Sequence, residues 1–351
     1  MVDEEMGRLT FVGLGLGPKG VSLEGAEELK SADVTYLEYY TSPHEPSLLK
    51  ELERVVGKHL TIVDREFIED GSKILEEASM KKVAIAVQGD PMIATTHGEL
   101  RARAARAGVE TRIVHGATIA SSAASESGLH YYKFSRTVTV TREAVGRLTQ
   151  AYHILHQNLL EGAHTLLLLE YDVESGEGVS PAGAMAGLLL AEGNFKRGVV
   201  GDATFAIVIS RLGRVDRSLA AGDIADLAKK DYGQPPHSII IPGKLHFTET
   251  EAIAAIFGAD ASKIRSNSDG VPRTAQTLVP KYVAKTKRAL DSVKGKLGPQ
   301  YEAVIENAEL YMKDSENFLA NGQDELAMLS IGYAEGLIDS LSFAGVAKID
   351  W

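Results

Sequence analysis

Short apolar runs alternate with longer amphipathic stretches through the first third of the chain. The pattern predicts strands over residues 9–15, 34–39, 83–88 and 110–114, and helices over 23–31, 45–56, 71–80 and 96–107. Strands that alternate with helices build a parallel sheet covered by helices on both faces. Residues 1–115 are therefore predicted to form an α/β lobe.

The pattern changes after residue 134. It predicts strands over residues 137–140, 164–170, 204–210 and 238–242, and helices over 181–192 and 215–231. Fewer crossover helices between strands favour a mixed sheet with antiparallel pairing. Residues 116–265 are therefore predicted to form a second α/β lobe, with the ligand site in the crevice between the lobes.

A turn-forming segment, NSDGVP at residues 267–272, precedes a third pattern. Beyond it, apolar positions at helical spacing fall in three segments separated by Gly-Pro and Asn-Gly pairs, which predicts a three-helix bundle over residues 266–351. The first helix is basic and the second acidic, so the simplest interpretation is that their side chains form ion pairs with each other. A docking module for a protein or RNA is the alternative.

The amino-acid composition excludes several kinds of cofactor and ligand. The 351 residues are 44% hydrophobic and 24% charged, as in ordinary globular proteins. With no cysteine, disulfides, thiolate nucleophiles, iron–sulfur clusters and cysteine-bound zinc are excluded, and no metal site is expected. The net charge of −11 disfavours nucleic acid as the main ligand. No apolar run approaches the ~18 residues of a membrane span and MVDEEMGR lacks a signal-peptide pattern, so a cytoplasmic location without membrane partners is expected.

Three loops rich in small residues follow predicted strands of the first lobe: GLGLG at residues 13–17, QGDP at 88–91 and HGATIASSA at 115–123. Because the carboxyl ends of parallel strands meet at one sheet edge, these loops are predicted to converge on a ligand. Each loop alone also has a structural interpretation: a tight turn, a turn capped by Asp90, or a closely packed helix start. The first loop, with Glu38 at the end of the next predicted strand, resembles a dinucleotide fingerprint, so an NAD-dependent oxidoreductase is an alternative; Pro18 departs from that fingerprint.

Over residues 9–260 the chain resembles the tetrapyrrole-methylase-like superfamily of S-adenosylmethionine-dependent methyltransferases and, within it, archaeal members of the diphthine synthase family. The segments that carry the resemblance are TFVGLGLG, GDPMIATTHGELRARAARAGVE, HGATIASSAASESGLHYYKF, AHTLLLLE and QPPHSIIIPGKLHFTE. The resemblance implies a two-lobed homodimer that uses S-adenosyl-L-methionine and releases S-adenosyl-L-homocysteine. It implies repeated N-methylation of a 3-amino-3-carboxypropyl histidine on translation elongation factor 2. A precorrin-type tetrapyrrole methyltransferase is the nearer alternative.

The resemblance also assigns cofactor contacts, motif by motif. They are Leu16, Asp90, Ile93, Thr118, Ile119, Leu169, Leu212 and His237. The loop glycines are expected to shape the backbone, and neither Asp90 nor His237 is assigned as a base. Tyr131, Tyr132 and Phe134 could receive a methylated ammonium, although core packing is favoured for them. Residues 141–157 and 171–180 depart from the family pattern and are expected to border substrate access.

Overall fold

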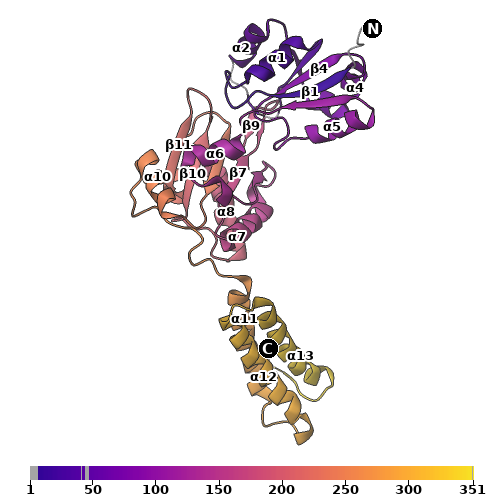
Figure 1. Cartoon of the computed structure of the whole chain (residues 1–351). Helices are drawn as coiled ribbons and strands as arrows, with labels where there is room; N and C mark the ends of the chain where they lie inside the picture. The colour runs from indigo at the N-terminus through magenta and orange to yellow at the C-terminus, as the bar shows by residue number, and fades with distance from the viewer. Residues whose placement is uncertain (1–6, 41, 44–46, 350) are drawn as a thin grey trace. The chain divides into compact units, whose positions relative to one another are not determined.

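The computed structural model describes residues 7–40, 42–43, 47–349 and 351. The chain folds into two compact units, Met1–Asp269 and Gly270–Trp351. The first unit contains two five-stranded sheets, and the second contains the helices α11, α12 and α13 (Figure 1). No helix in the described part of the chain combines the length and the apolarity needed to cross a membrane.

The first lobe is built on a parallel sheet with strand order β3-β2-β4-β1-β5. The strands are β1 (Arg8–Gly13), β2 (Val34–Glu38), β3 (Thr61–Val63), β4 (Lys82–Val87) and β5 (Glu110–Val114); the helices are α1 (Leu23–Ser31), α2 (Leu48–Val56), α3 (Arg65–Asp70), α4 (Ser72–Ala78) and α5 (His97–Arg106). Alternate residues of β1 and β4 face two separate apolar cores. One core includes α1 and α2, and the other includes α4 and α5, so helices cover both faces of the sheet (Figure 1).

Residues 57–71 differ from the sequence prediction, because β3 and α3 were not expected there. β3 has three residues and, among the described residues, pairs with β2 alone at the sheet edge; three residues are too short a run for hydrophobic periodicity to mark. α3 is a six-residue helix whose N-cap, Asp64, accepts a hydrogen bond from the Phe67 amide. The helix predicted from residue 45 begins at Leu48, and residues 45 and 46 lie outside the described residues.

The second lobe has a mixed sheet with strand order β11-β10-β12-β7-β6, in which β6 and β7 are parallel and the other pairs antiparallel. Its strands are β6 (Val138–Val140), β7 (Thr165–Leu169), β10 (Phe205–Ser210), β11 (Ser218–Asp223) and β12 (His237–Ile241), with a hairpin of β8 (Tyr171–Asp172) and β9 (Glu177–Gly178). The helices are α6 (Ile119–Ser127), α7 (Thr149–Leu160), α8 (Pro181–Phe195), α9 (Ile224–Leu227) and α10 (Phe247–Phe257), and short 3-10 turns span Tyr131–Lys133 and Val145–Arg147. The predicted two-lobed α/β fold is confirmed.

The helix predicted over residues 215–231 is wrong. The segment contains the edge strand β11, which pairs antiparallel with β10 over six residue pairs, and then the four-residue helix α9. Alanine and leucine in this segment favour a helix locally, but the buried edge of β10 supplies hydrogen-bond partners for an extended chain. Gly222, at φ 155°, permits the extended backbone just before α9.

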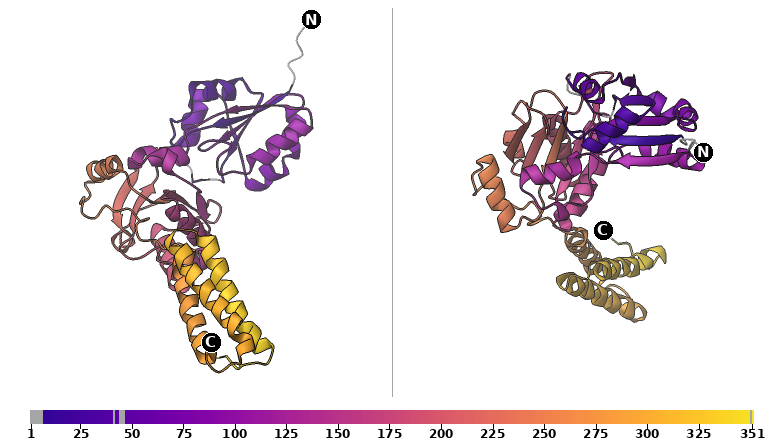
Figure 2. Two further views of the ribbon diagram at one scale, coloured as in Figure 1. Left: turned by 60° about the horizontal axis from the view of Figure 1, so that its bottom comes forward. Right: turned by 45° about the horizontal axis from the view of Figure 1, so that its top comes forward.

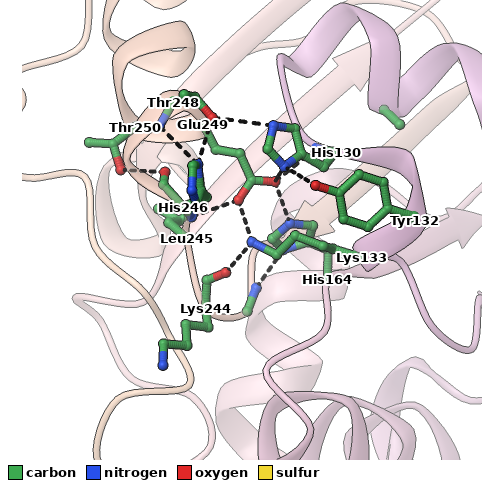
Figure 3. Close-up of polar contacts among 12 residues, drawn as sticks. His130, Tyr132, Lys133, His164, Lys244, Leu245, His246, Thr248, Glu249 and Thr250 are labelled. Carbon is green, nitrogen blue, oxygen red and sulfur yellow. Dashed lines mark hydrogen bonds and ion pairs between the residues drawn. The ribbon is translucent and has the colours of Figure 1, made fainter.

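A buried carboxylate, Glu249 at the start of α10, joins three segments of the second lobe (Figure 3). Its Oε1 accepts from the His130 amide at 2.8 Å and from His164 Nε2 at 2.9 Å; its Oε2 accepts from the His246 amide at 2.7 Å and from Lys133 Nζ. Burial alone would raise the pKa of Glu249, but these hydrogen bonds outweigh it and lower the pKa to about 2. The carboxylate is therefore charged throughout the physiological range.

The second unit is a bundle of α11 (Thr274–Val293), α12 (Glu302–Ala320) and α13 (Asp324–Phe343), with a 3-10 turn at Pro299–Tyr301 before α12. Figure 2 shows the three helices, orange to yellow, running alongside one another, and each contacts the other two. Lys294, the C-cap of α11, pairs with Glu309 of α12, as opposite charge on these helices predicted. Lys285 of α11 pairs with Glu335 of α13 at 2.5 Å.

Candidate active site

The three small-residue loops of the first lobe meet at the carboxyl edge of its sheet. The Gly15 amide donates to the Gly89 carbonyl at 3.1 Å and the Gly89 amide donates back to the Gly15 carbonyl at 2.8 Å, which joins the first two loops. A Cβ on Gly116, in the third loop, would lie 2.3 Å from the Gly89 oxygen, and a Cβ on Gly13 would lie 2.5 Å from the Gly116 nitrogen. The glycines therefore allow backbone to pack directly on backbone.

Asp90 fixes the second loop to the third. Its Oδ1 accepts from the Met92 amide at 2.9 Å, while its Oδ2 lies 2.7 Å from His115 Nδ1 and 3.4 Å from the Gly116 amide. The carboxylate is 6% exposed, and both oxygens are used within the protein. Asp90 therefore lines the site chiefly as a loop-shaping residue.

The segment after Asp90 is held in an uncommon conformation. Ala94 has φ 57°, in the left-handed region that costs a non-glycine residue of order 1 kcal/mol. His97, fully buried at the start of α5, stabilises this turn: its amide donates to Thr95 Oγ1 at 3.1 Å and its Nδ1 also bonds that hydroxyl. Burial lowers the pKa of His97 to about 4, so its ring is neutral at pH 7.

A cavity of about 1100 Å³ lies between loops of the two lobes. Seven of the eight residues predicted to contact the cofactor line it: Leu16, Asp90, Ile93, Thr118, Ile119, Leu169 and Leu212. The eighth, His237, does not; its neighbours Pro236 and Ser238 do. The His237 ring is buried with Nδ1 2.8 Å from Ser210 Oγ, and burial together with the positive charge of Arg211 lowers its pKa to about 4. At neutral pH His237 is therefore a weak base.

The second lobe reaches the first at the loop that follows β10. A Cβ on Gly213 would lie 2.5 Å from the Leu16 Cβ, and a Cβ on Gly17 would lie 2.2 Å from the Gly213 oxygen. Arg214 Nη2 donates to the Pro43 carbonyl of the first lobe. Leu16 and Leu212, predicted from motifs almost 200 residues apart, thus belong to one wall of the cavity.

Arg211, next to Leu212 in the chain, holds that part of the cavity wall in place. It is 8% exposed with φ 52°, donates to the Tyr232 carbonyl at 2.6 Å, and pairs with the Asp216 carboxylate at 2.7 Å. A buried cation that is held by several fixed acceptors fixes the spacing of the loops that supply them, here the loop with Asp216 and the loop with Tyr232. Its role is therefore to place Leu212 and Pro236 on the cavity wall.

Comparison with known proteins places this site in a family. Residues 8–228 match the family described as Tetrapyrrole (Corrin/Porphyrin) Methylases. The chain is 37% identical to diphthine synthase of Methanosarcina mazei over 255 residues, 71% of this chain and 95% of the relative, and 34% identical to that of Methanothermobacter thermautotrophicus, over 72% and 96%. A crystal structure of diphthine synthase superimposes with a TM-score of 0.65 at 33% identity, covering 73% of this chain and 98% of that one. The chain belongs to the diphthine synthase family.

Membership of the diphthine synthase family favours neither the precorrin-type nor the NAD-dependent alternative. A separate match covers residues 281–347 of the bundle, to a family described as a protein of unknown function (DUF357). The family match of residues 8–228 lies wholly within the first unit, which also contains the cavity.

The two segments that diverge from the family pattern, residues 141–157 and 171–180, both contribute lining residues to the cavity. Thr141, Arg142 and Glu143 line it from the first divergent segment, and Tyr171, Asp172 and Glu174 line it from the second. Arg142 joins the two segments: its amide donates to Glu170 Oε2 at 2.7 Å, and its guanidinium bonds Asp172, Ser175 and Glu177. The hairpin β8–β9 is thereby held beside the cavity.

Several lining residues were not predicted, among them Tyr40, Arg65, Thr96 and Thr139. Tyr40 directly follows the predicted strand 34–39, so the rule that ligands bind where parallel strands end would have found it. Arg65 lies on α3, a helix that periodicity did not mark, and no sequence signal pointed to it.

The aromatic residues considered for a methylated ammonium lie elsewhere. None of Tyr131, Tyr132 and Phe134 lines the cavity. Phe134 packs in the core of the second lobe, with its ring 5.3 Å from that of His164. Tyr131 and Tyr132 are exposed, and Tyr132 lies beside the Glu249 network, with its hydroxyl 2.9 Å from His130 Nδ1 (Figure 3). Core packing thus holds for Phe134 and is wrong for the two tyrosines.

Proposed function

We propose that this protein transfers methyl groups from S-adenosyl-L-methionine to the amino nitrogen of a 3-amino-3-carboxypropyl histidine on translation elongation factor 2, in diphthamide biosynthesis. The observation that carries the proposal is the convergence of the predicted contact residues of both lobes on one cavity, in a chain of the diphthine synthase family. We further propose that it acts as a homodimer, which the family resemblance supports.

The residues of the cavity fit such a donor. Its volume of about 1100 Å³ slightly exceeds that of typical ligand pockets, roughly 300–1000 Å³, which leaves room for an acceptor side chain as well. Five apolar side chains among the predicted contacts, Leu16, Ile93, Ile119, Leu169 and Leu212, suit a nucleoside, and the glycine loops bring backbone polar groups to the same edge. When bound, S-adenosyl-L-methionine would supply an electrophilic methyl group on a positively charged sulfur.

The chain's own contribution is to hold the two reactants in register and to exclude water. Orientation of this kind is worth up to ~7–11 kcal/mol of the barrier. The acceptor amine must be neutral to react, and desolvation in a cavity lowers the pKa of an amine. His237 is a weak base outside the lining and the Asp90 oxygens are engaged, so we assign no dedicated base.

The test is a mass-spectrometric assay. Elongation factor 2 bearing the 3-amino-3-carboxypropyl group is incubated with the full-length protein and S-adenosyl-L-methionine. We expect mass gains in steps of one methylene unit on a single modified histidine, and none when the donor is omitted. Absence of any gain, with a protein that binds S-adenosyl-L-homocysteine in calorimetry, would contradict the proposed acceptor.

A further inference from the structure

Four arginines are among the described residues that line the cavity, and three of them are engaged by the protein. They are Arg65, Arg142, Arg211 and Arg214. Arg211 is held by backbone carbonyls and Asp216, Arg142 is held by the β8–β9 hairpin, and Arg214 bonds the Pro43 carbonyl. Their guanidinium groups therefore have structural roles.

Arg65 differs from the other three. Its ion pair with Glu69, one helical turn away, has a nitrogen–oxygen distance of 3.7 Å, longer than a hydrogen bond. The guanidinium lies over the ring of Tyr40, 5.0 Å from its centroid, and the side chain is 60% exposed. The ring thus supports the cation at the cavity wall, and the Arg65 donors have no acceptor at hydrogen-bond distance among the described residues.

Tyr40 adds an independent observation on the same wall. The residue is 9% exposed, and its hydroxyl has no regular hydrogen-bond partner among the described residues, although Thr96 lies close enough to lower its pKa. Burial, helped by the charge of Glu38, outweighs that effect and raises the pKa of Tyr40 to about 12. At neutral pH the hydroxyl is therefore protonated, and it has no acceptor within the part of the chain that the structure describes.

We propose that Arg65, supported by Tyr40, binds a carboxylate in this cavity, and that the ligand group is the carboxylate of an α-amino acid. A carboxylate that leaves water needs a cation and charge-assisted hydrogen bonds, and the planar guanidinium matches its two oxygens. The inference rests on the proposed function, because both reactants carry this group: the methionine end of the donor and the 3-amino-3-carboxypropyl side chain of the acceptor.

The experiment compares two full-length variants, Arg65→Gln and Arg54→Gln. Arg54 is a matched control, since it is also an exposed helical arginine paired with a glutamate of its own helix, Glu51, and does not line the cavity. The Kd for S-adenosyl-L-homocysteine is measured by calorimetry, and the KM for modified elongation factor 2 is measured at saturating donor. One of these constants should rise about tenfold or more in Arg65→Gln and stay unchanged in Arg54→Gln.

The two measurements separate the two sources of carboxylate. A rise in the Kd for S-adenosyl-L-homocysteine assigns Arg65 to the donor, and an unchanged Kd with a raised KM assigns it to the acceptor; Arg65→Lys should recover part of either loss by keeping the charge. If neither constant changes, or if Arg54→Gln changes them equally, the inference is overturned. A wild-type protein that binds S-adenosyl-L-homocysteine but methylates nothing would instead contradict the proposed function.

Discussion

Glu249 joins the loops around α10 through its hydrogen bonds. It accepts four hydrogen bonds while fully buried, including one from the cation of Lys133. We expect Glu249→Gln to lower the free energy of unfolding of the first unit by about 3 kcal/mol, because it leaves the Lys133 cation without its anionic partner. Urea denaturation at pH 7 measures this. Glu251→Gln, an exposed position on the same helix, should unfold like the wild type.

The same carboxylate predicts a pH dependence. Its pKa in the folded protein, about 2, is below the ordinary value of 4.5, so folding favours the charged form. The stabilisation is complete above pH 4.5 and is lost as the pH falls from there through 2. We expect the unfolding free energy of the wild type to fall across this interval more steeply than that of Glu249→Gln. Parallel curves for the two proteins would contradict the role given to Glu249.

A substitution at Gly116 tests whether the three loops must pack closely, because it adds a single Cβ atom where they meet. A methyl group there would lie 2.3 Å from the Gly89 oxygen, so backbone must move and the loops must separate. We expect Gly116→Ala to weaken binding of S-adenosyl-L-homocysteine by at least about tenfold, measured by calorimetry. Gly98→Ala is the control, since nothing lies within 4 Å of the added Cβ. It should bind normally and be up to about 1 kcal/mol more stable, because alanine is the better helix former.

At the scale of elements, the β8–β9 hairpin depends on Arg142. The hairpin has only two residue pairs, and Arg142 contacts Asp172, Ser175 and Glu177 on it. We expect Arg142→Gln to raise the KM for modified elongation factor 2 several-fold and to leave the Kd for S-adenosyl-L-homocysteine within about twofold, since the predicted donor contacts lie on other loops.

The matched control for Arg142 is Arg147→Gln. Arg147 lies five residues further along the chain, is exposed, and does not line the cavity. Its kinetics should be those of the wild type. A Kd for S-adenosyl-L-homocysteine that rises as much as the KM in Arg142→Gln would show that the hairpin shapes the donor side instead.

Elements with a clear hydrophobic period could be predicted from the sequence. Elements whose conformation depends on contacts with neighbouring strands or helices could not. α1 was predicted to the residue, because its amphipathic pattern coincides with the Ser22 N-cap. β11 was predicted as a helix, because its extended form depends on the edge of β10, which local composition does not record. The short elements β3 and α3 were not predicted, because three and six residues are too few to show a hydrophobic period.

The same distinction applies to the site. Strand ends and small residues were enough to predict that loops at residues 13–17, 88–91 and 115–123 meet, because parallel strands share an edge. The contacts from the second lobe needed the family resemblance, since nothing local relates Leu212 to Leu16. Neither the local pattern nor the family resemblance predicted Arg65, because its position depends on the Tyr40 ring beneath it.

At the scale of the whole molecule, the division after Asp269 predicts that the first unit binds its donor alone. Both sheets, their cores and all cavity-lining residues precede this point. We expect residues 1–269 to fold and to bind S-adenosyl-L-homocysteine with the affinity of the full chain, as measured by calorimetry. A loss of binding by this fragment would show that the bundle takes part in the donor site.

The position of the cut decides the outcome, because the last residues before it hold the second sheet together. Asn267 accepts from the Phe205 amide at 2.9 Å and donates to the Phe205 and Pro242 carbonyls at 2.8 and 2.7 Å, and Ser266 Oγ accepts from the Leu245 amide at 2.8 Å. A fragment ending at residue 265 loses all four hydrogen bonds and should be about 4 kcal/mol less stable than residues 1–269, at about 1 kcal/mol each. Urea denaturation of the two fragments measures the difference. Equal stability would place the end of the folded unit before Ser266.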